Sequence, residues 1–427
     1  MGERSYFCID MKTFYASVEC ADRGLNPFET NLVVADLSRG KNALCLAVSP
    51  RMKAQGVKNR CRLSDIPACI RYEVAPPRMQ RYVDCAADIY ALYLRYFSPA
   101  DIHVYSIDES FIDATPYLGV YKKTPGQLAR ELMGKIAGEL RIPSTAGIGT
   151  NLYLAKVALD ITAKHSPSHI GVLDEESYRA TLWDHEPITD FWQVGAGTAR
   201  TLQRYGIRSM RGVAEAPEEL LYRRFGVNAE LLIDHAWGRE SCRIEDIKNY
   251  RPQSQSVSFS QILPRDYTKA EAATVITEML FHGTRELMRR HVIARGVSLY
   301  VGYSRDLRPA DHGGVRLIGA TATPSKMLPF VQQLFDTLAD PVVPVRRLGL
   351  NFTEVSDEDG EGYDLFSDPR ELERERSRER TALALTDKYG KNAVLRGVNY
   401  LPAATQRERN GMIGGHRAGY DDTLGAG

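Results

Sequence analysis

The chain has 427 residues and a formal net charge of +1, with 43% hydrophobic and 26% charged residues. This composition is typical of a soluble globular protein, and the length predicts about two to four domains. No run of about 18 apolar residues is present, which argues against a membrane span, and the N-terminus lacks a signal-peptide pattern. The seven cysteines form no CxxC pair or zinc-like cluster, so we expect reduced thiols and a cytoplasmic protein.

The first 170 residues alternate between strand and helix patterns. Strands are predicted over 6–10 and 145–149, and a strand hairpin over 102–114 whose turn carries Asp108 and Glu109. Amphipathic helices are predicted over 78–97 and 125–140. Helices on one face of a mainly antiparallel sheet predict an α+β layer.

The pattern becomes helical from about 171 to 238, and polar residues 246–254 read as a linker. Residues 256–355 return to strand, helix and strand, which predicts a separate small α+β domain of two long helices and four short strands. The stretch 241–355 holds 15 Lys and Arg against 11 Asp and Glu, which suits either a solvated face or a nucleic-acid backbone. Polar residues 356–427 predict a mobile tail with local helix near 370–389.

Three carboxylates are the strongest chemical signal. Asp10 ends one apolar strand pattern, and Asp108 and Glu109 interrupt another. Each could be a solvated turn residue or a strand-end cap, but buried carboxylates are costly without a partner. If the two strands are neighbours, the three side chains and the carbonyl of Met11 would suit two Mg²⁺ ions and phosphoryl or nucleotidyl transfer.

Two further features would suit a nucleotide site. The aromatic pair Phe14 and Tyr15 opens a predicted helix beside Asp10, where it could be core packing or could stack under a sugar and exclude a 2′-hydroxyl. Lys53 follows a strand on a short predicted helix, and Lys164 ends a predicted helix entered from the Gly147-Ile148-Gly149 strand. These lysines could be ordinary surface charges, or they could neutralise a triphosphate.

A glycine-rich turn lies in the helical region. Val194-Gly195-Ala196-Gly197 precedes a helix start, and Tyr205-Gly206-Ile207 follows. The pattern matches a helix-hairpin-helix, in which backbone N–H groups approach a DNA phosphate without reading sequence. An ordinary helical turn is the alternative.

Together these residues resemble the Y-family translesion DNA polymerases, of the UmuC/ImpB/MucB type, along nearly the whole chain. The motifs that carry the resemblance are the aromatic-rich stretch from Asp10 to Glu19, Ser106-Ile107-Asp108-Glu109, and Gly147-Ile148-Gly149 with Leu154-Ala155-Lys156. The resemblance implies a right-hand polymerase fold in the α+β class. It implies a palm (1–13 and 78–172), fingers (14–77), a helix-hairpin-helix thumb (173–240), a linker (241–255), a little finger (256–355) and a flexible C-terminal tail (356–427).

The resemblance also implies roles for individual residues. Asp10, Asp108 and Glu109 would hold two Mg²⁺ ions, and Tyr15 would be the steric gate against ribonucleotides. Thr13 and Phe14 would contact the incoming dNTP through main-chain amides, and Lys53 and Lys164 would hold its triphosphate. Residues 194–197 would contact the DNA backbone.

The predicted tail contains a motif that resembles a sliding-clamp-binding pentapeptide. Its residues Tyr363, Asp364, Leu365 and Phe366 follow Gly362, where relatives usually carry glutamine. A replication sliding clamp is therefore an expected partner, and a chance match is the alternative. The resemblance further implies primer–template DNA as partner, with a UmuD-like protein or a recombinase as an additional one.

The sequence therefore predicts a low-fidelity DNA polymerase that extends primers past damaged bases in the SOS response. Two alternatives stay open. One is a catalytically silent DNA-binding accessory protein, against which the intact carboxylate set argues. The other is a different two-metal enzyme, such as a nucleotide cyclase or nuclease, against which Tyr15 and the hairpin argue.

Overall fold

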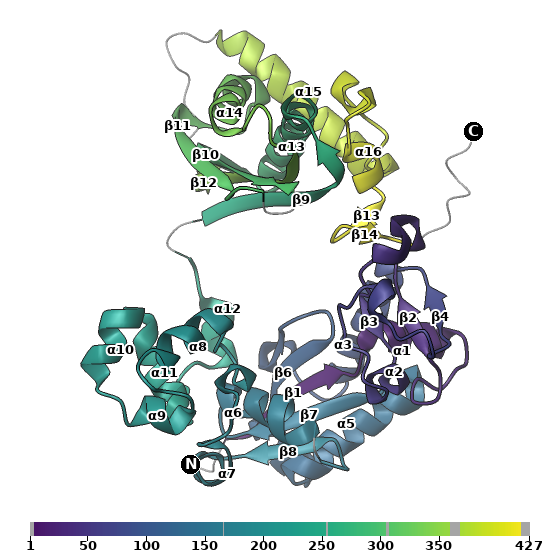
Figure 1. Cartoon of the computed structure of the whole chain (residues 1–427), viewed down its shortest axis with the longest axis vertical. Helices are drawn as coiled ribbons and strands as arrows, with labels where there is room; N and C mark the ends of the chain where they lie inside the picture. The colour runs from purple at the N-terminus through teal and green to yellow at the C-terminus, as the bar shows by residue number, and fades with distance from the viewer. Residues whose placement is uncertain (1–3, 165, 253–254, 305–306, 359–367, 420–427) are drawn as a thin grey trace. The chain divides into compact units, whose positions relative to one another are not determined.

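A computed structural model describes residues 4–164, 166–252, 255–304, 307–358 and 368–419. The chain divides into two compact units, one of residues 1–250 with 418–427 and the other of residues 251–417 (Figure 1). Each unit has its own hydrophobic core.

A five-stranded sheet forms the centre of the first unit. Its strand order is β5-β6-β1-β7-β8, antiparallel except for the β7–β8 pair. The strands are β5 (Ile102–Val104), β6 (Glu109–Asp113), β1 (Tyr6–Met11), β7 (Ser144–Gly149) and β8 (Ile170–Leu173). The predicted hairpin over 102–114 is confirmed, although Glu109 begins β6 instead of lying in the turn.

Helices accompany this sheet. They are α1 (Phe14–Asp22), α3 (Met79–Tyr93), α4 (Thr115–Tyr121), α5 (Pro125–Leu140), α6 (Leu152–Val157) and the π-helix η4 (Ala158–Ala163). Of these, α5, α6 and η4 pack directly on strands β7 and β8. The glycines of β7 allow α6 and η4 to approach closely. A Cβ on Gly147 would lie 2.0 Å from the Ala155 carbonyl oxygen, and one on Gly149 would lie 2.2 Å from the Ala155 nitrogen. Only glycine fits at these positions, which explains the Gly-Ile-Gly motif.

A small subdomain follows α1. Its three strands, in the order β3-β2-β4, are β3 (Ala47–Val48), β2 (Leu32–Val34) and β4 (Glu73–Ala75). The short helix α2 (Pro50–Ala54) begins with Ser49 as its N-cap and proline at its first position, as helix starts favour. The 3₁₀ segments η1 (Leu37–Asn42) and η2 (Leu63–Asp65) complete this part, and its small core includes Val33, Val48 and Met52.

The region from Asp174 to Tyr250 is helical, whereas helices were predicted only from about 171 to 238. Its elements are α7 (Glu175–Leu182), η5 (Ile188–Asp190), α8 (Ala196–Gln203), α9 (Met210–Ala214), α10 (Glu218–Phe225), α11 (Asn228–Ala236) and α12 (Ile244–Asn249). The stretch 241–255, predicted as a linker, thus contains a helix. Ile244 of α12 is buried in the core cluster that contains Tyr6 and Phe111, which is why this segment is ordered.

The second unit has a four-stranded antiparallel sheet in the order β11-β10-β12-β9, with helices along it (Figure 1). Its elements are β9 (Gln255–Tyr267), α13 (Lys269–Arg289), β10 (Val292–Tyr303), β11 (Asp311–Thr321), α14 (Pro324–Leu338) and β12 (Val345–Asp357). Two long helices and four strands were predicted. The four strands are 11 to 13 residues long, so the prediction of short strands is wrong. Strand pairing continues beyond the apolar runs because polar residues occupy every other position there.

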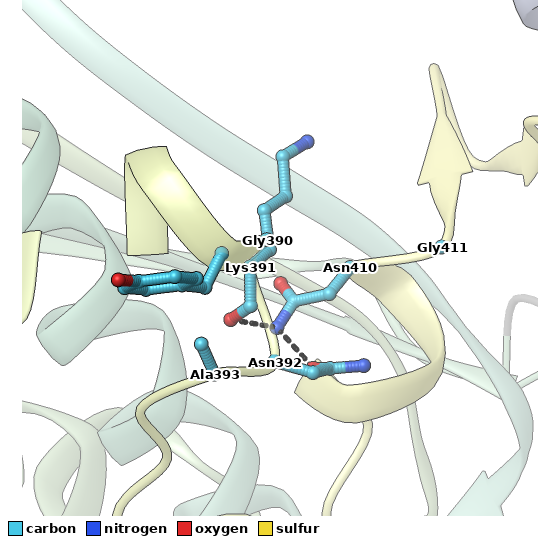
Figure 2. Close-up of a pocket in the computed structure, with 7 residues that line it drawn as sticks. Gly390, Lys391, Asn392, Ala393, Asn410 and Gly411 are labelled. Carbon is cyan, nitrogen blue, oxygen red and sulfur yellow. Dashed lines mark hydrogen bonds between the residues drawn. The ribbon is translucent and has the colours of Figure 1, made fainter. Parts of the chain in front are cut away.

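The expected mobile tail is wrong for residues 368–417, which fold onto the second unit. They form α15 (Pro369–Tyr389), η8 (Gly397–Tyr400), α16 (Gln406–Arg409) and the hairpin of β13 (Met412–Ile413) with β14 (His416–Arg417). Figure 2 shows Asn410 holding this segment together through the Lys391 carbonyl (3.1 Å) and Asn392 (2.7 Å).

A buried carboxylate anchors the segment to α13. Glu278 is 1% exposed and accepts hydrogen bonds from Asn399 Nδ2 (2.7 Å) and the Thr405 N–H (2.7 Å). Arg285 of α13 also pairs with Glu379 of α15 at 3.1 Å. Buried polar partners therefore help to order this polar stretch.

Candidate active site

Two neighbouring strands bring the three acidic residues to one end of the five-stranded sheet. Asp10 of β1 lies directly opposite Glu109 of β6, and the Met11 N–H donates to the Asp108 carbonyl oxygen at 2.9 Å. Asp10 shares a face of β1 with Cys8 and Tyr6 because side chains alternate along a strand. That face packs against α6.

The Glu109 carboxylate is paired with a lysine from α6. Lys156 Nζ lies 2.8 Å from Glu109 Oε1 and 3.0 Å from Asp160 Oδ2, and the Cys8 thiol donates to Glu109 Oε1 at 3.1 Å. The Lys156 and Glu109 side chains are only 9% and 10% exposed. Burial lowers the pKa of Lys156, but Cys8, Glu109 and Asp160 outweigh it and raise that pKa. Lys156 is therefore a buried ammonium at the acidic site.

The other two carboxylates differ in their surroundings. Asp108 Oδ1 accepts a hydrogen bond from the Ser106 hydroxyl at 2.6 Å. Burial, followed by the charges of Asp108 and Glu109, raises the pKa of Asp10 to about 7. Like charges held together in a dry place raise a carboxyl pKa in this way.

The acidic residues suit Mg²⁺ in chemistry, although their side chains are not gathered as a coordination cluster. Within the described ranges, no three His, Cys, Asp or Glu side chains are arranged to hold a metal ion. Glu109 faces Lys156 instead. The carboxylate oxygens are the ligands that Mg²⁺ prefers, and a divalent cation would relieve the repulsion seen in the raised Asp10 pKa.

The aromatic residues lie directly after the acidic strand end. Thr13 has a left-handed backbone (φ 47°) and caps α1, so the chain turns sharply between Asp10 and the helix. The Tyr15 ring stacks on Tyr82 of α3, with centroids 4.5 Å apart, and the Phe14 ring is buried. Tyr15 is half-buried, and Asp108 contributes to its raised pKa after burial does. The structure thus places Tyr15 near the carboxylates.

Lysine ammonium groups surround the acidic site. Desolvation lowers the pKa of Lys53, with Lys164 acting in the same direction and Asp10 and Asp108 in the opposite one. Because these charges influence one another, Lys53 of α2 and Lys164, at the C-terminal end of η4, lie near the acidic residues. Lys164 is 63% exposed and lies 3.7 Å from Asp160.

Sequence reasoning missed three residues of this arrangement. Lys12 has a pKa lowered by burial and by Lys53, and its ammonium lies 3.1 Å from His169 Nδ1. Lys156 was read only as part of a motif, and Asp160 was not considered. The spacing of Lys156, Asp160 and Lys164 at every fourth position was a usable signal, because it places them on one helix face.

The predicted hairpin motif lies at the start of α8. Val194 is buried, whereas Gly195, Ala196 and Gly197 are exposed and open the helix. A Cβ on either glycine would meet no atom within 4 Å, so the backbone there is accessible. The preceding element is the 3₁₀ turn η5 and not a full helix. The predicted clamp-binding residues 363–366 lie outside the described residues.

Comparisons with known proteins identify the family of this chain. A family model described as the impB/mucB/samB family matches residues 9–160, and the model of its C-terminal domain matches residues 254–365. UvrX of Bacillus subtilis (strain 168), named for UV-damage repair, is 32% identical over 97% of this chain and 98% of its own length. DNA polymerase IV 2 of the same strain is 31% identical over 97% and 99%.

The chain belongs to the Y-family DNA polymerases. It is a DNA-directed DNA polymerase of the translesion type, similar to DNA polymerase IV. This result favours the polymerase over the accessory protein and over the cyclase or nuclease. The relatives named above carry the names UvrX and DNA polymerase IV and not UmuC.

A solved structure of a Y-family polymerase shares the fold of this chain. The Y-family DNA polymerase chimera of Dbh and Dpo4 matches with a TM-score of 0.64 and 20% identity, over 82% of this chain and 99% of the chimera. The second unit of the structure contains the family's C-terminal domain, the little finger. Among the described residues, no helix of this polymerase has the length and apolar character to cross a membrane.

Proposed function

We propose that Asp10, Asp108 and Glu109 form the catalytic centre of this translesion polymerase, with the carbonyl of Met11 as a further metal ligand. The register that sets Asp10 opposite Glu109, with Asp108 tied to Met11, carries the proposal. Two bound Mg²⁺ ions would activate the primer 3′-hydroxyl and neutralise charge on the leaving pyrophosphate. The carboxylates would hold and orient these ions.

The residues after Asp10 would select and orient the incoming dNTP. Thr13 makes no side-chain cap hydrogen bond to α1, so the first N–H groups of this helix would suit phosphate oxygens. Phe14 fixes the helix start by burial, and the Tyr15 ring would exclude a 2′-hydroxyl. Its stacking on Tyr82 supports a fixed position, as a steric gate requires.

Lys53 and Lys164 would neutralise the triphosphate, and Lys12 extends this pair. The lowered pKa values of Lys12 and Lys53 reflect desolvation and neighbouring positive charge, which an anion would relieve. Residues 194–197 would hold the primer–template backbone through exposed N–H groups.

The predicted domains fit this assignment. Residues 1–13 and 78–172 would be the palm, 14–77 the fingers and 173–240 the thumb. Low fidelity, a cytoplasmic location and a sliding clamp bound through 363–366 belong to the same proposal. The narrower UmuC assignment, with a UmuD-like or recombinase partner, rests on the resemblance alone.

Primer extension tests the catalytic centre. With Mg²⁺ and four dNTPs, Asp108→Ala should abolish extension on damaged and undamaged templates while duplex binding persists. Asp113→Ala is the matched control, since Asp113 ends the strand that begins directly after Asp108. Retained synthesis by Asp108→Ala would overturn the metal-ligand assignment.

A further inference from the structure

The small subdomain of residues 25–75 contains two cysteines that face each other. Leu44 and Arg62 form an isolated antiparallel bridge, which places Cys45 opposite Cys61. The Cys45 N–H donates to the Cys61 carbonyl oxygen at 2.8 Å. Both side chains pack in the same small core, Cys45 fully buried and Cys61 half-buried.

The local backbone brings the two thiols together. The Cys45 carbonyl accepts from the Arg60 N–H at 3.1 Å, so Arg60 and Cys61 together face Cys45, as in a β-bulge. Arg60 has a left-handed backbone (φ 60°), which turns the chain at this point. The Cys61 side chain lies close enough to Cys45 to raise the pKa of the Cys45 thiol. Directly opposed residues of an antiparallel pair have the Cα separation that a disulfide needs.

We propose that Cys45 and Cys61 are an oxidant-sensitive pair that forms a reversible disulfide when the polymerase meets peroxide. Solvent reaches Cys61 and not Cys45. Burial, and then the neighbouring Cys61, raises the pKa of Cys45 to about 12. Cys45 therefore stays protonated at neutral pH, and Cys61 reacts first.

The chemistry balances with hydrogen peroxide as the oxidant. The Cys61 sulfur attacks one peroxide oxygen, the O–O bond breaks, and one water leaves as Cys61 becomes a sulfenic acid. The Cys45 sulfur then loses its proton and attacks the Cys61 sulfur. The S–S bond forms, the S–O bond breaks, and a second water leaves. A thiol reductant reverses the step by exchange.

The bond would close the loop 46–60, which contains α2 and Lys53. Closing such a loop restricts the unfolded chain and stabilises the folded subdomain. Any effect on dNTP binding would rest on the proposed role of Lys53. Formation of the disulfide does not depend on the role of Lys53. The disulfide proposal and the proposed function can therefore be disproved separately.

Peptide mapping of the full-length protein tests the proposal. The reduced protein is treated with graded hydrogen peroxide, blocked with an alkylating agent and digested without reductant. We expect a Cys45–Cys61 linked peptide about 2 Da lighter than the two free peptides. The melting temperature should rise by about 5 °C or more, and dithiothreitol should reverse both changes.

Single-cysteine variants separate this pair from general oxidation. Cys61→Ser and Cys61→Ala should both lose the link and the melting shift. Cys69→Ser, which removes an exposed cysteine of the same subdomain, should behave as the wild type. The proposal is overturned if Cys61 proceeds to sulfinic acid without a link, or if the melting shift persists without Cys61.

Discussion

The ring of Tyr15 stacks on the ring of Tyr82, with centroids 4.5 Å apart and planes inclined by 16°. Tyr82 is fully buried in α3, and its hydroxyl donates to Glu19 of α1 at 2.8 Å. Arg78 also holds Glu19 through a bidentate contact at 2.9 Å. The position of Tyr15 is therefore set by a residue 67 places further along the chain.

Tyr82 should influence sugar selection without contacting a nucleotide. An aromatic pair is worth about 0.5–1.5 kcal/mol, so we expect Tyr82→Ala to raise ribonucleotide incorporation roughly 2- to 10-fold. Tyr15→Ala should raise it more. Tyr82→Phe, which keeps the ring and loses the hydrogen bond to Glu19, should stay near wild type. Single-nucleotide insertion of ATP against dATP measures this, and equal selectivity in all variants would contradict it.

Lys156 should act as a resident cation beside the acidic residues. Lys156→Met leaves the buried Glu109 without its ammonium and leaves Asp160 only the more distant Lys164, and breaking a buried ion pair costs about 3–5 kcal/mol. We expect a lower melting temperature in EDTA and a larger stabilisation by added Mg²⁺ than in the wild type.

Lys164→Met is the control for Lys156, because it removes the same charge at an exposed site near Asp160. It should change both melting temperatures little. An equal Mg²⁺ response in Lys156→Met and wild type would show that Lys156 does not compete with the metal. Thermal melting needs no DNA synthesis, so the result is independent of catalysis.

Asp10 should make the metal-free protein sensitive to pH. Its folded pKa of about 7 lies above the ordinary value of 3.8, so the folded state holds a proton that the unfolded state releases. The corresponding stability is fully present below pH 3.8 and is lost as the pH rises through about 7. In EDTA, the melting temperature should fall as the pH rises from about 4 to about 7 and should level off above that, and Asp10→Asn should flatten this slope. A slope unchanged by Asp10→Asn would refute the assignment.

Glu278 should hold the C-terminal segment on the little finger. Glu278→Ala leaves the buried Thr405 N–H and Asn399 amide without an acceptor. We expect a loss of about 3 kcal/mol in unfolding free energy and faster proteolysis within 390–410. Glu286→Ala, which removes a half-buried carboxylate of the same helix that pairs with Arg289 and Arg290, is the control. Unchanged proteolysis in Glu278→Ala would contradict the anchoring role.

Much of the first unit could be predicted from its sequence because local patterns and spatial position agree there. The apolar runs around Asp10 and around Asp108 predicted two strands without establishing that they are neighbours, and the register shows that they pair. Lys156 shows the limit of this approach. Its partner Glu109 lies 47 residues away, and no local pattern reveals which of several carboxylates a buried lysine will meet.

The C-terminal segment was mispredicted for a related reason. Its charges indicate a solvated chain when read by composition alone. In the fold, Glu379 is buried and pairs with Arg285, while Leu372 and Ala382 supply small apolar contacts. Ion pairs with α13 favour an ordered C-terminal segment. The composition of the segment alone does not reveal such pairs.

Because α6 approaches β7 closely, activity should also depend on residues that carry no reactive group. Gly147 and Gly149 set the depth at which α6 lies, and that depth determines whether Lys156 reaches Glu109. A saturation mutational scan for activity should therefore show intolerance at these two glycines comparable to that at the acidic residues. Ranking positions by side-chain chemistry alone would overlook them.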